Sequence, residues 1–238
     1  MSLADHRSTL APHGFLRVAI NLGNPVLAQG DARSPRGPSL ELATALAQRM
    51  GVQARFTCHD AAASVVEAAG EDGWDLAFLA IDQARADRIA FSAPYVEIEG
   101  TYLVRADSPA QQVADLDREG LCIAVGRGAA YDLFLSRELR HATIERAETS
   151  AAAITLFDQQ RLDAAAGVRQ PLEAWAQAHP GHRVLAGRFT AIQQAVAAPA
   201  SRPADALRAL FEEVEAIKAG PLLEAAFARA GQAVTLVR

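Results

Sequence analysis

Short apolar runs alternate with amphipathic segments along the first eighty residues of the chain. Phe15 to Ile20 is apolar and is followed by turn residues at 21–25, which indicates a strand that ends in a loop. Ser39 is expected to cap a helix with an apolar stripe at every fourth position, stopped by Gly51. A strand at 52–58, a helix at 61–70 and a buried strand at 75–80 complete a β-α-β-α-β order.

The same alternation restarts at residue 121, after an extended stretch at 89–106. The expected elements are strands at 121–126, 143–148, 162–167 and 182–187, helices at 129–139, 150–160 and 169–178, an extended segment at 190–198, and helices at 203–219 and 221–230.

This order predicts an α/β protein in which helices cover mostly parallel sheets. The break in the pattern near residues 100–110 predicts two such sheets. Ligands of open α/β sheets bind beyond the carboxyl ends of the strands, so a cleft between two lobes is expected.

Composition limits the classes of function. The chain has 238 residues, of which 50% are hydrophobic, which is enough for one large domain or two lobes of about a hundred residues each. A net charge of -5 with scattered Lys and Arg excludes a nucleic-acid footprint. Apolar stretches are too short for a membrane span. The first fourteen residues hold no apolar core of a secretory signal, so either a signal has been removed or the protein is cytoplasmic.

Cysteine and histidine spacing gives no sign of a metal or a cofactor. Cys58 and Cys122 are far apart and are interpreted as small buried hydrophobes. His179 and His182 flank a Pro-Gly turn, which does not present two ligands on one helix face. We therefore expect neither a metal site nor a bound cofactor.

Arg85 follows the buried strand 75–80 by about one turn. Its guanidinium could reach back over the end of that strand, where its planar donors suit a carboxylate. Backbone N–H groups at Ala80 to Asp82 would add donors. The alternative is a solvated helix residue paired with Asp82 or Asp87.

The segment Val125-Gly-Arg-Gly-Ala-Ala-Tyr131 runs from a strand through glycines into a helix. Such a junction directs N–H groups and the positive end of the helix dipole at one point, which suits an anion. A tight turn or a dinucleotide fingerprint are the alternatives. The fingerprint is weak because Tyr131 occupies its third glycine position, although Glu148 has the spacing of a ribose-binding acid.

Arg169 stands at the expected start of the helix after strand 162–167, where a cation is unfavourable for the dipole. Either a bound anion or a salt bridge to Glu173 would stabilise it.

Known catalytic signatures such as GxSxG, HExxH and the P-loop are missing. Glu97 and Glu99 are interpreted as solvent-exposed strand positions. Trp74 and Trp175 are interpreted as packing residues.

Four stretches carry a resemblance to a known family. They are FLRVAINLGN (15–24), GPSLELATALAQRMG (37–51), WDLAFLAIDQARADRIAFSAPY (74–95) and RLDAAAG (161–167). Over residues 15–230 the chain resembles the family 3 solute-binding proteins of ABC importers, which include the polar amino acid receptors. The third stretch is the most specific.

The resemblance implies a periplasmic binding protein type 2 fold, with two lobes joined by two strands that close on a ligand. Lobe 1 would comprise 1–104 and 195–238, and lobe 2 would comprise 105–194. It also implies a periplasmic monomer that delivers a small anionic or zwitterionic solute to a membrane permease, without catalysis. The ligand-binding residues would be Arg85, which grips a carboxylate, together with Asn21, Asn24, Phe78, Ala80, Asp82, Arg127, Ala129, Ala130 and Arg169.

Departures from the family pattern bear on the solute. Val168 stands where an acid usually binds the α-ammonium group, which argues against an ordinary α-amino acid. Arg85, Arg127 and Arg169 together favour a small polar organic acid with two anionic ends. Two alternatives stay open: an enzyme of the cyclohexadienyl dehydratase type, for which Glu173 is the nearby acid, and a cytoplasmic ligand-sensing domain.

Overall fold

The computed structural model describes residues 2–69 and 71–238, and the chain forms two compact units. Unit 1 is Met1–Glu97 with Gln193–Arg238, and unit 2 is Ile98–Ile192. The chain passes from one unit to the other within strand β5 (Val96–Arg105) and returns within β10 (Thr190–Pro199). The predicted boundaries after residues 104 and 194 fall in these same two strands.

Unit 1 is built on a mixed sheet of the order β2-β1-β3-β10. β1 (Phe15–Asn21) is parallel to β2 (Gln53–His59) and to β3 (Leu76–Ala80), whereas β10 is antiparallel to β3. The short strand β4 (Ile89–Phe91) pairs with β10, and β11 (Thr235–Leu236) pairs with the first residues of β5. Every residue of β3 is buried, as the continuous apolar run at 75–80 predicts.

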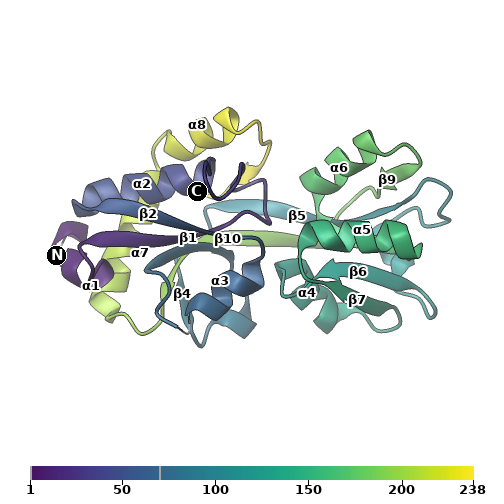
Figure 1. Cartoon of the computed structure of the whole chain (residues 1–238), viewed down its shortest axis with the longest axis horizontal. Coiled ribbons are helices and arrows are strands. Elements are labelled where there is room, and N and C mark those ends of the chain that lie inside the picture. Colours follow the sequence, from purple (N-terminus) through teal and green to yellow (C-terminus); the bar gives the residue numbers. More distant parts are fainter. Residues whose placement is uncertain (1, 70) are drawn as a thin grey trace. The chain divides into compact units, whose positions relative to one another are not determined.

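Helices of unit 1 pack on this sheet and on one another. They are α1 (Arg7–Leu10), α2 (Pro38–Met50), α3 (Ala62–Ala69), α7 (Ala204–Lys218) and α8 (Leu222–Arg229), with 3₁₀ turns η1 (Leu3–His6) and η2 (Gln83–Arg85). α2 packs on β1 and β2 and lies beside α8, and α3 packs on β1 and β2 (Figure 1). α2 ends at Gly51 in the left-handed region, as predicted. Its N-cap, however, is Gly37 and not Ser39, because Pro38 takes the first helical position and Ser39 is buried inside the first turn.

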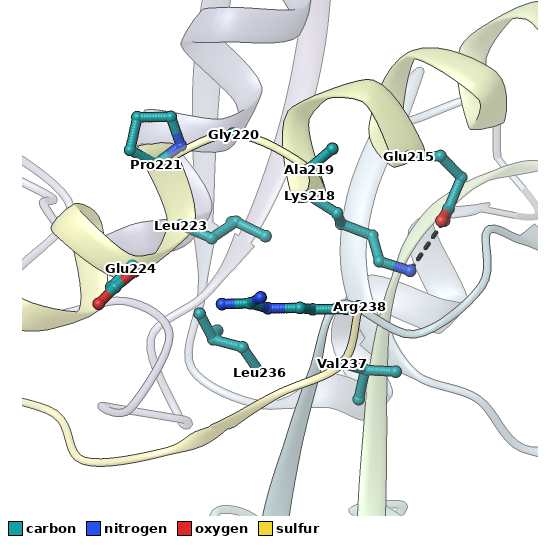
Figure 2. A pocket seen from close by; sticks show the side chains of 10 residues that line it. All are labelled: Glu215, Lys218, Ala219, Gly220, Pro221, Leu223, Glu224, Leu236, Val237 and Arg238. Carbon is teal, nitrogen blue, oxygen red and sulfur yellow. Dashed lines mark hydrogen bonds and ion pairs between the residues drawn. The ribbon is translucent and has the colours of Figure 1, made fainter.

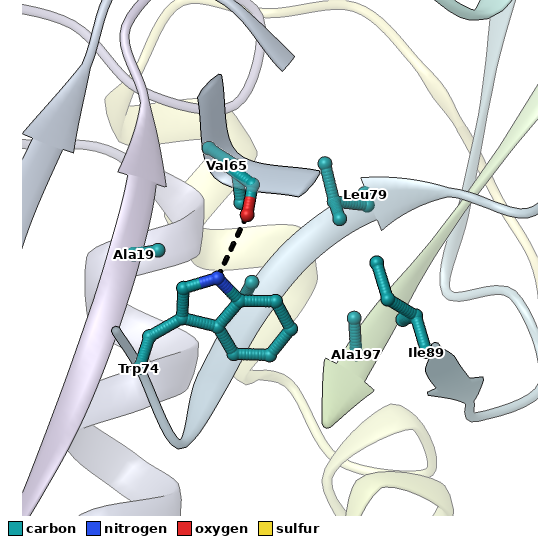
Figure 3. Packing of buried hydrophobic residues seen from close by; sticks show 7 residues of the cluster. Ala19, Val65, Trp74, Leu79, Ile89 and Ala197 are labelled. Carbon is teal, nitrogen blue, oxygen red and sulfur yellow. Dashed lines mark hydrogen bonds between the residues drawn. The ribbon is translucent and has the colours of Figure 1, made fainter. Parts of the chain in front are cut away.

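Trp74 anchors a core cluster of unit 1. Its ring is 1% exposed, and it packs with Ala19, Val65, Leu79, Ile89 and Ala197 (Figure 3). The indole Nε1 donates to the carbonyl of Val65 at 2.8 Å, so the polar end of the ring is satisfied inside the core. The prediction of a packing role for Trp74 is confirmed.

A buried ion cluster ties the amino-terminal ends of β1 and β3 together. The side chain of Asp75 is fully buried and accepts from Arg17 Nη2 at 2.8 Å and from Arg202 Nη2 at 2.7 Å. Arg17 also bonds to the exposed Asp72 at 2.9 Å. The hydrogen bonds to Asp75 raise the pKa of Arg17 further above its usual range. One carboxylate thus holds two largely buried guanidinium groups.

Unit 2 repeats the α/β pattern with the strand order β5-β8-β6-β7. β6 (Cys122–Gly126) is parallel to β7 (Thr143–Ala147) and to β8 (Ala164–Val168), while β5 is antiparallel to β8 and to β9 (His182–Val184). Its helices are α4 (Ala130–Glu138), α5 (Ser150–Gln160) and α6 (Arg169–Ala178), after the 3₁₀ turn η3 (Val113–Leu116). The predicted elements of this half are confirmed, and α5 packs on β6 and β8 (Figure 1).

Candidate functional site

The parallel strands of unit 1 end together at one edge of the sheet. Asn21 pairs with His59 at the ends of β1 and β2, and β3 ends at Ala80. The loops that follow these three strands therefore lie at the same edge. We call this the unit 1 edge; it carries Asn21, Asn24, His59, Asp60, Ala80, Ile81, Asp82 and Arg85.

Arg85 is buried at the unit 1 edge and is not a solvated helix residue. Only 4% of its surface is exposed, and its Nη1 donates to the carbonyl of Ala80 at 2.9 Å. Burial lowers its pKa, because desolvation penalises the charged form, and the negative charge of Asp82 opposes that effect. The guanidinium has thus reached back over the end of β3, the geometry expected from its position in the sequence.

Asp82 positions the turn that carries Arg85. Its carboxylate caps η2 by accepting from the backbone N–H of Ala84 at 2.9 Å, and the residue is 8% exposed. Ala80 and Phe78, the other predicted residues of this strand, are buried as well. The ring of Phe78 packs edge-on against that of Tyr95, with 6.3 Å between the ring centroids. Phe78 is therefore part of the core next to the unit 1 edge.

Asn21 and Asn24 shape the loop that follows β1. The side-chain oxygen of Asn21 accepts from Gly23 N at 2.9 Å, and that of Asn24 accepts from Val26 N at 3.3 Å. Both bonds are local Asx turns, so backbone donors fix which way each carboxamide points. The amide NH₂ groups are the donors of these two side chains.

Gly23 lets this loop lie against the end of β2. A Cβ at this position would stand 2.4 Å from the carbonyl oxygen of Asp60, far inside van der Waals contact. Gly23→Ala is expected to force the loop outward and to lower the free energy of unfolding by about 1–3 kcal/mol, measured in urea. Gly220→Ala is the control, because its Cβ would meet nothing closer than 3.5 Å. Equal stability of the two variants would contradict this account.

His59 and Asp60 belong to the edge but were not predicted. Burial lowers the pKa of His59, and the nearby charge of Asp60 opposes that shift only in part. This shift favours the neutral form of His59. The signal that could have found both residues is their place directly after a predicted strand.

Unit 2 has a corresponding edge, where β6, β7 and β8 end together. Gly126 pairs with Ala147, and β8 ends at Val168, which is the N-cap of α6. β5 runs antiparallel beside β8 with Gly100 opposite Val168, which brings Glu99 to the same place. We call this the unit 2 edge; it carries Glu99, Arg127, Ala129, Ala130, Glu148, Val168, Arg169, Glu173 and Arg188.

The backbone N–H groups of the glycine loop before α4 donate hydrogen bonds within the protein. Gly126 donates to the hydroxyl of Tyr131, Arg127 to the carbonyl of Ala147, Gly128 to the carboxylate of Asp132, and Ala129 to the carbonyl of Gly126. Asp132 is buried and is held by Arg146 at 3.0 Å. A carboxylate of the protein thus already stands at the positive end of α4. The anion site expected here is reduced to the first-turn N–H groups that begin at Ala130.

Arg127 and Arg169 are both paired with acids of the same unit. Arg127 is 56% exposed and lies 3.6 Å from Glu148. Glu148, whose spacing suits a ribose in the dinucleotide interpretation, is therefore paired with Arg127 at the surface. Arg169 donates to Glu99 at 2.6 Å and to the carbonyl of Gly187, and lies 3.5 Å from Glu173. The salt bridge to Glu173, one of the two alternatives for stabilising Arg169, is present. Glu99, interpreted as a solvent-exposed strand position, is 42% exposed, and it also lies 3.8 Å from Arg188.

A cavity elsewhere in unit 1 contains none of the predicted ligand residues. It has a volume of about 510 Å³ and is lined by Glu215, Lys218, Ala219, Gly220, Pro221, Leu223, Glu224, Leu236, Val237 and Arg238 (Figure 2). Lys218 is bonded to Glu215 at 2.9 Å, which gives its buried ammonium group a partner within the protein. Among the described residues, no group of three or more His, Cys, Asp or Glu side chains could hold a metal ion.

Comparison with known proteins identifies the family. The model of the bacterial extracellular solute-binding proteins, family 3, matches residues 16–228. The chain belongs to this family. No curated protein matches the sequence. Within the described residues, no helix is long and apolar enough to cross a membrane.

Solved structures of other binding proteins share the fold at low sequence identity. A solute receptor for L-cysteine from Neisseria gonorrhoeae has a TM-score of 0.80 and 22% identity, over 97% of this chain and 93% of that one. An amino acid ABC transporter substrate-binding protein from Streptococcus pneumoniae, bound to L-arginine, has a TM-score of 0.78 and 17% identity over the full length of both. An ancestral amino acid-binding protein described as a precursor of cyclohexadienyl dehydratase has a TM-score of 0.77 and 21% identity, over 96% and 99%. The periplasmic binding protein type 2 fold predicted for this family 3 protein is confirmed.

Proposed function

We propose that this protein is the substrate-binding component of an ABC importer and captures a small carboxylate-bearing solute. In this proposal the carboxylate of the solute binds Arg85 at the unit 1 edge. The protein acts as a monomer in the periplasm and delivers the solute to a membrane permease.

The burial of Arg85 at the end of β3 is the observation that carries this proposal. A guanidinium that is 4% exposed and whose charged form is penalised by desolvation is stabilised by an incoming anion. Its planar donors suit a carboxylate in particular. Membership of the family and the amino acid ligands named for the similar structures support the same function.

The enzymatic alternative has less support from the acid on which it depends. Glu173 is 46% exposed and lies 3.5 Å from Arg169, on the second turn of α6. A general acid is more effective when it is desolvated and kept protonated until the reaction. We therefore propose binding without turnover.

A screen of small acids tests the proposal. Amino acids, hydroxy acids, oxo acids and dicarboxylates would be compared with neutral sugars by thermal shift and calorimetry. At least one acid is expected to stabilise the protein by about 2.7 kcal/mol at a hundred times its Kd, while the sugars have no effect. Binding by none of the acids would contradict the proposal, and turnover of prephenate or arogenate would favour the enzyme.

A further inference from the structure

The cavity at the carboxyl end of α7 is large enough for a small organic molecule. Its volume of about 510 Å³ lies within the range of about 300–1,000 Å³ that is common for ligand pockets. The end of α7, the start of α8 and the residues of and after β11 form its walls (Figure 2). All of its lining residues belong to unit 1, and none of them lies at the unit 1 edge.

Lys218, which lines this cavity, is the only lysine of the chain, since all the other strongly basic residues are arginines. Its side chain is 4% exposed, although a lysine in the last turn of a helix can usually keep its ammonium group in water. An ammonium group has three N–H donors, and the bond to Glu215 at 2.9 Å uses one of them. No other described residue accepts from Lys218, so its ammonium group can bind a further acceptor at the cavity wall.

Arg238 adds a second cation to the same cavity. Its guanidinium makes no hydrogen bond or ion pair with any residue that the structure describes, and Figure 2 shows it extending across the space between Leu223 and Leu236. Of the two acids at the cavity, Glu215 is bonded to Lys218, and Glu224 is exposed in the first turn of α8, where it favours the helix dipole. Both cations can therefore contact an incoming anion.

The start of α8 contributes backbone donors to this place. The first N–H groups of a helix have no acceptor within the helix, and Pro221, the N-cap of α8, provides no side-chain cap. Leu223 and Glu224 of this first turn line the cavity. These N–H groups and the positive end of the helix dipole favour an anion, as the two cations do.

The rest of the cavity wall is apolar. Leu223 is 2% exposed, and Leu236 is held in place because β11 pairs with β5, with Leu236 opposite Val96. Val237 is fixed as well, since its N–H donates to the carbonyl of Tyr95 at 3.1 Å. A ligand with a hydrocarbon part would cover this surface and remove it from water, which a bare inorganic anion would not do.

We propose that this cavity binds an amphiphilic organic anion, whose carboxylate contacts Lys218 and Arg238 and whose hydrocarbon part packs on Leu223 and Leu236. The site is separate from the one proposed at Arg85, and each can be present without the other.

Four probes separate charge from hydrophobicity. Octanoate has both the carboxylate and the chain, octanamide lacks the charge, acetate lacks the chain, and octylammonium has the opposite charge. In protein labelled with ¹³C-lysine, Lys218 gives the only lysine signal in the NMR spectrum, so this signal reports on the cavity. Octanoate is expected to shift the signal with a Kd at least about tenfold below that of each other probe.

Two variants of the ion pair test the role of Lys218. Lys218→Met keeps an unbranched side chain without the charge and is expected to weaken octanoate binding, measured by calorimetry, by at least about tenfold. Glu215→Gln is the matched control, because it breaks the same ion pair but keeps the ammonium group. This control is expected to bind octanoate at least as tightly as the parent. Equal losses in the two variants would overturn the proposal.

Arg238→Gln provides a second test that does not depend on the folding of Lys218→Met, because Arg238 is exposed. It is expected to weaken octanoate binding by about threefold. The proposal is overturned if octanoate causes no shift of the lysine signal below the concentration at which it forms micelles, or if octanamide or octylammonium binds as tightly. Octanoate binding that is lost in Arg85→Ala would place the probe at the unit 1 edge and would also overturn it.

Discussion

Arg85→Ala is expected to weaken binding of the tightest acid from the screen by about thirtyfold or more. Removing one partner of a desolvated, hydrogen-bonded charge pair commonly costs about 2–5 kcal/mol of binding free energy. The guanidinium is buried and is positioned by its hydrogen bond to the carbonyl of Ala80. No other described cation at the unit 1 edge replaces it. Calorimetry at low and high salt measures the loss.

Arg127→Ala is the control for this experiment, because Arg127 is 56% exposed and paired with Glu148 at the surface. It is expected to change affinity less than about threefold, since exposed ion pairs contribute little. Circular dichroism and thermal unfolding of both variants would show that the chain still folds. Comparable losses in the two variants would remove Arg85 from its proposed role.

Asp75→Asn is expected to lower the free energy of unfolding by about 3–5 kcal/mol. The change removes the charge that Arg17 and Arg202 share and leaves two largely buried guanidinium groups without their common partner. Urea unfolding followed by tryptophan fluorescence measures the effect. Because the chain has two tryptophans, a Trp175→Phe background restricts the signal to Trp74, which lies in unit 1.

Asp72→Asn is the matched control, since this second acid on Arg17 is 68% exposed. A loss below about 1 kcal/mol is expected for it, as for other exposed ion pairs. If both variants lost similar stability, the buried position of Asp75 would not be what gives the cluster its importance.

Sequence patterns predicted the regular elements because short apolar runs and helix-ending glycines are local signals. The segment before β1 was missed: η1 and α1 are short and mixed in polarity, and their buried Leu3 and Leu10 are recognisable only against the helices that cover them. Ser39 was chosen as a cap for its side chain, although Pro38 before it already marks the first helical residue.

At the candidate site, the sequence predicted which loops come together but not which charges are matched. Residues after parallel strands share an edge, and this rule alone places Asn21, Ala80 and Ala129. The pairing of Arg169 with Glu99 joins residues 70 positions apart and depends on the antiparallel register of β5 with β8. No local pattern contains that information.

The order of the two units along the chain has a consequence for biosynthesis. All the strands and helices of unit 2 come from one continuous segment, so its internal pairing is complete once residue 192 has been made. The sheet of unit 1 lacks its strand β10 and the helices α7 and α8 until the last segment has emerged. During synthesis on the ribosome, unit 2 can therefore reach its native packing before unit 1, which needs residues 193–238 to complete its sheet and its helices.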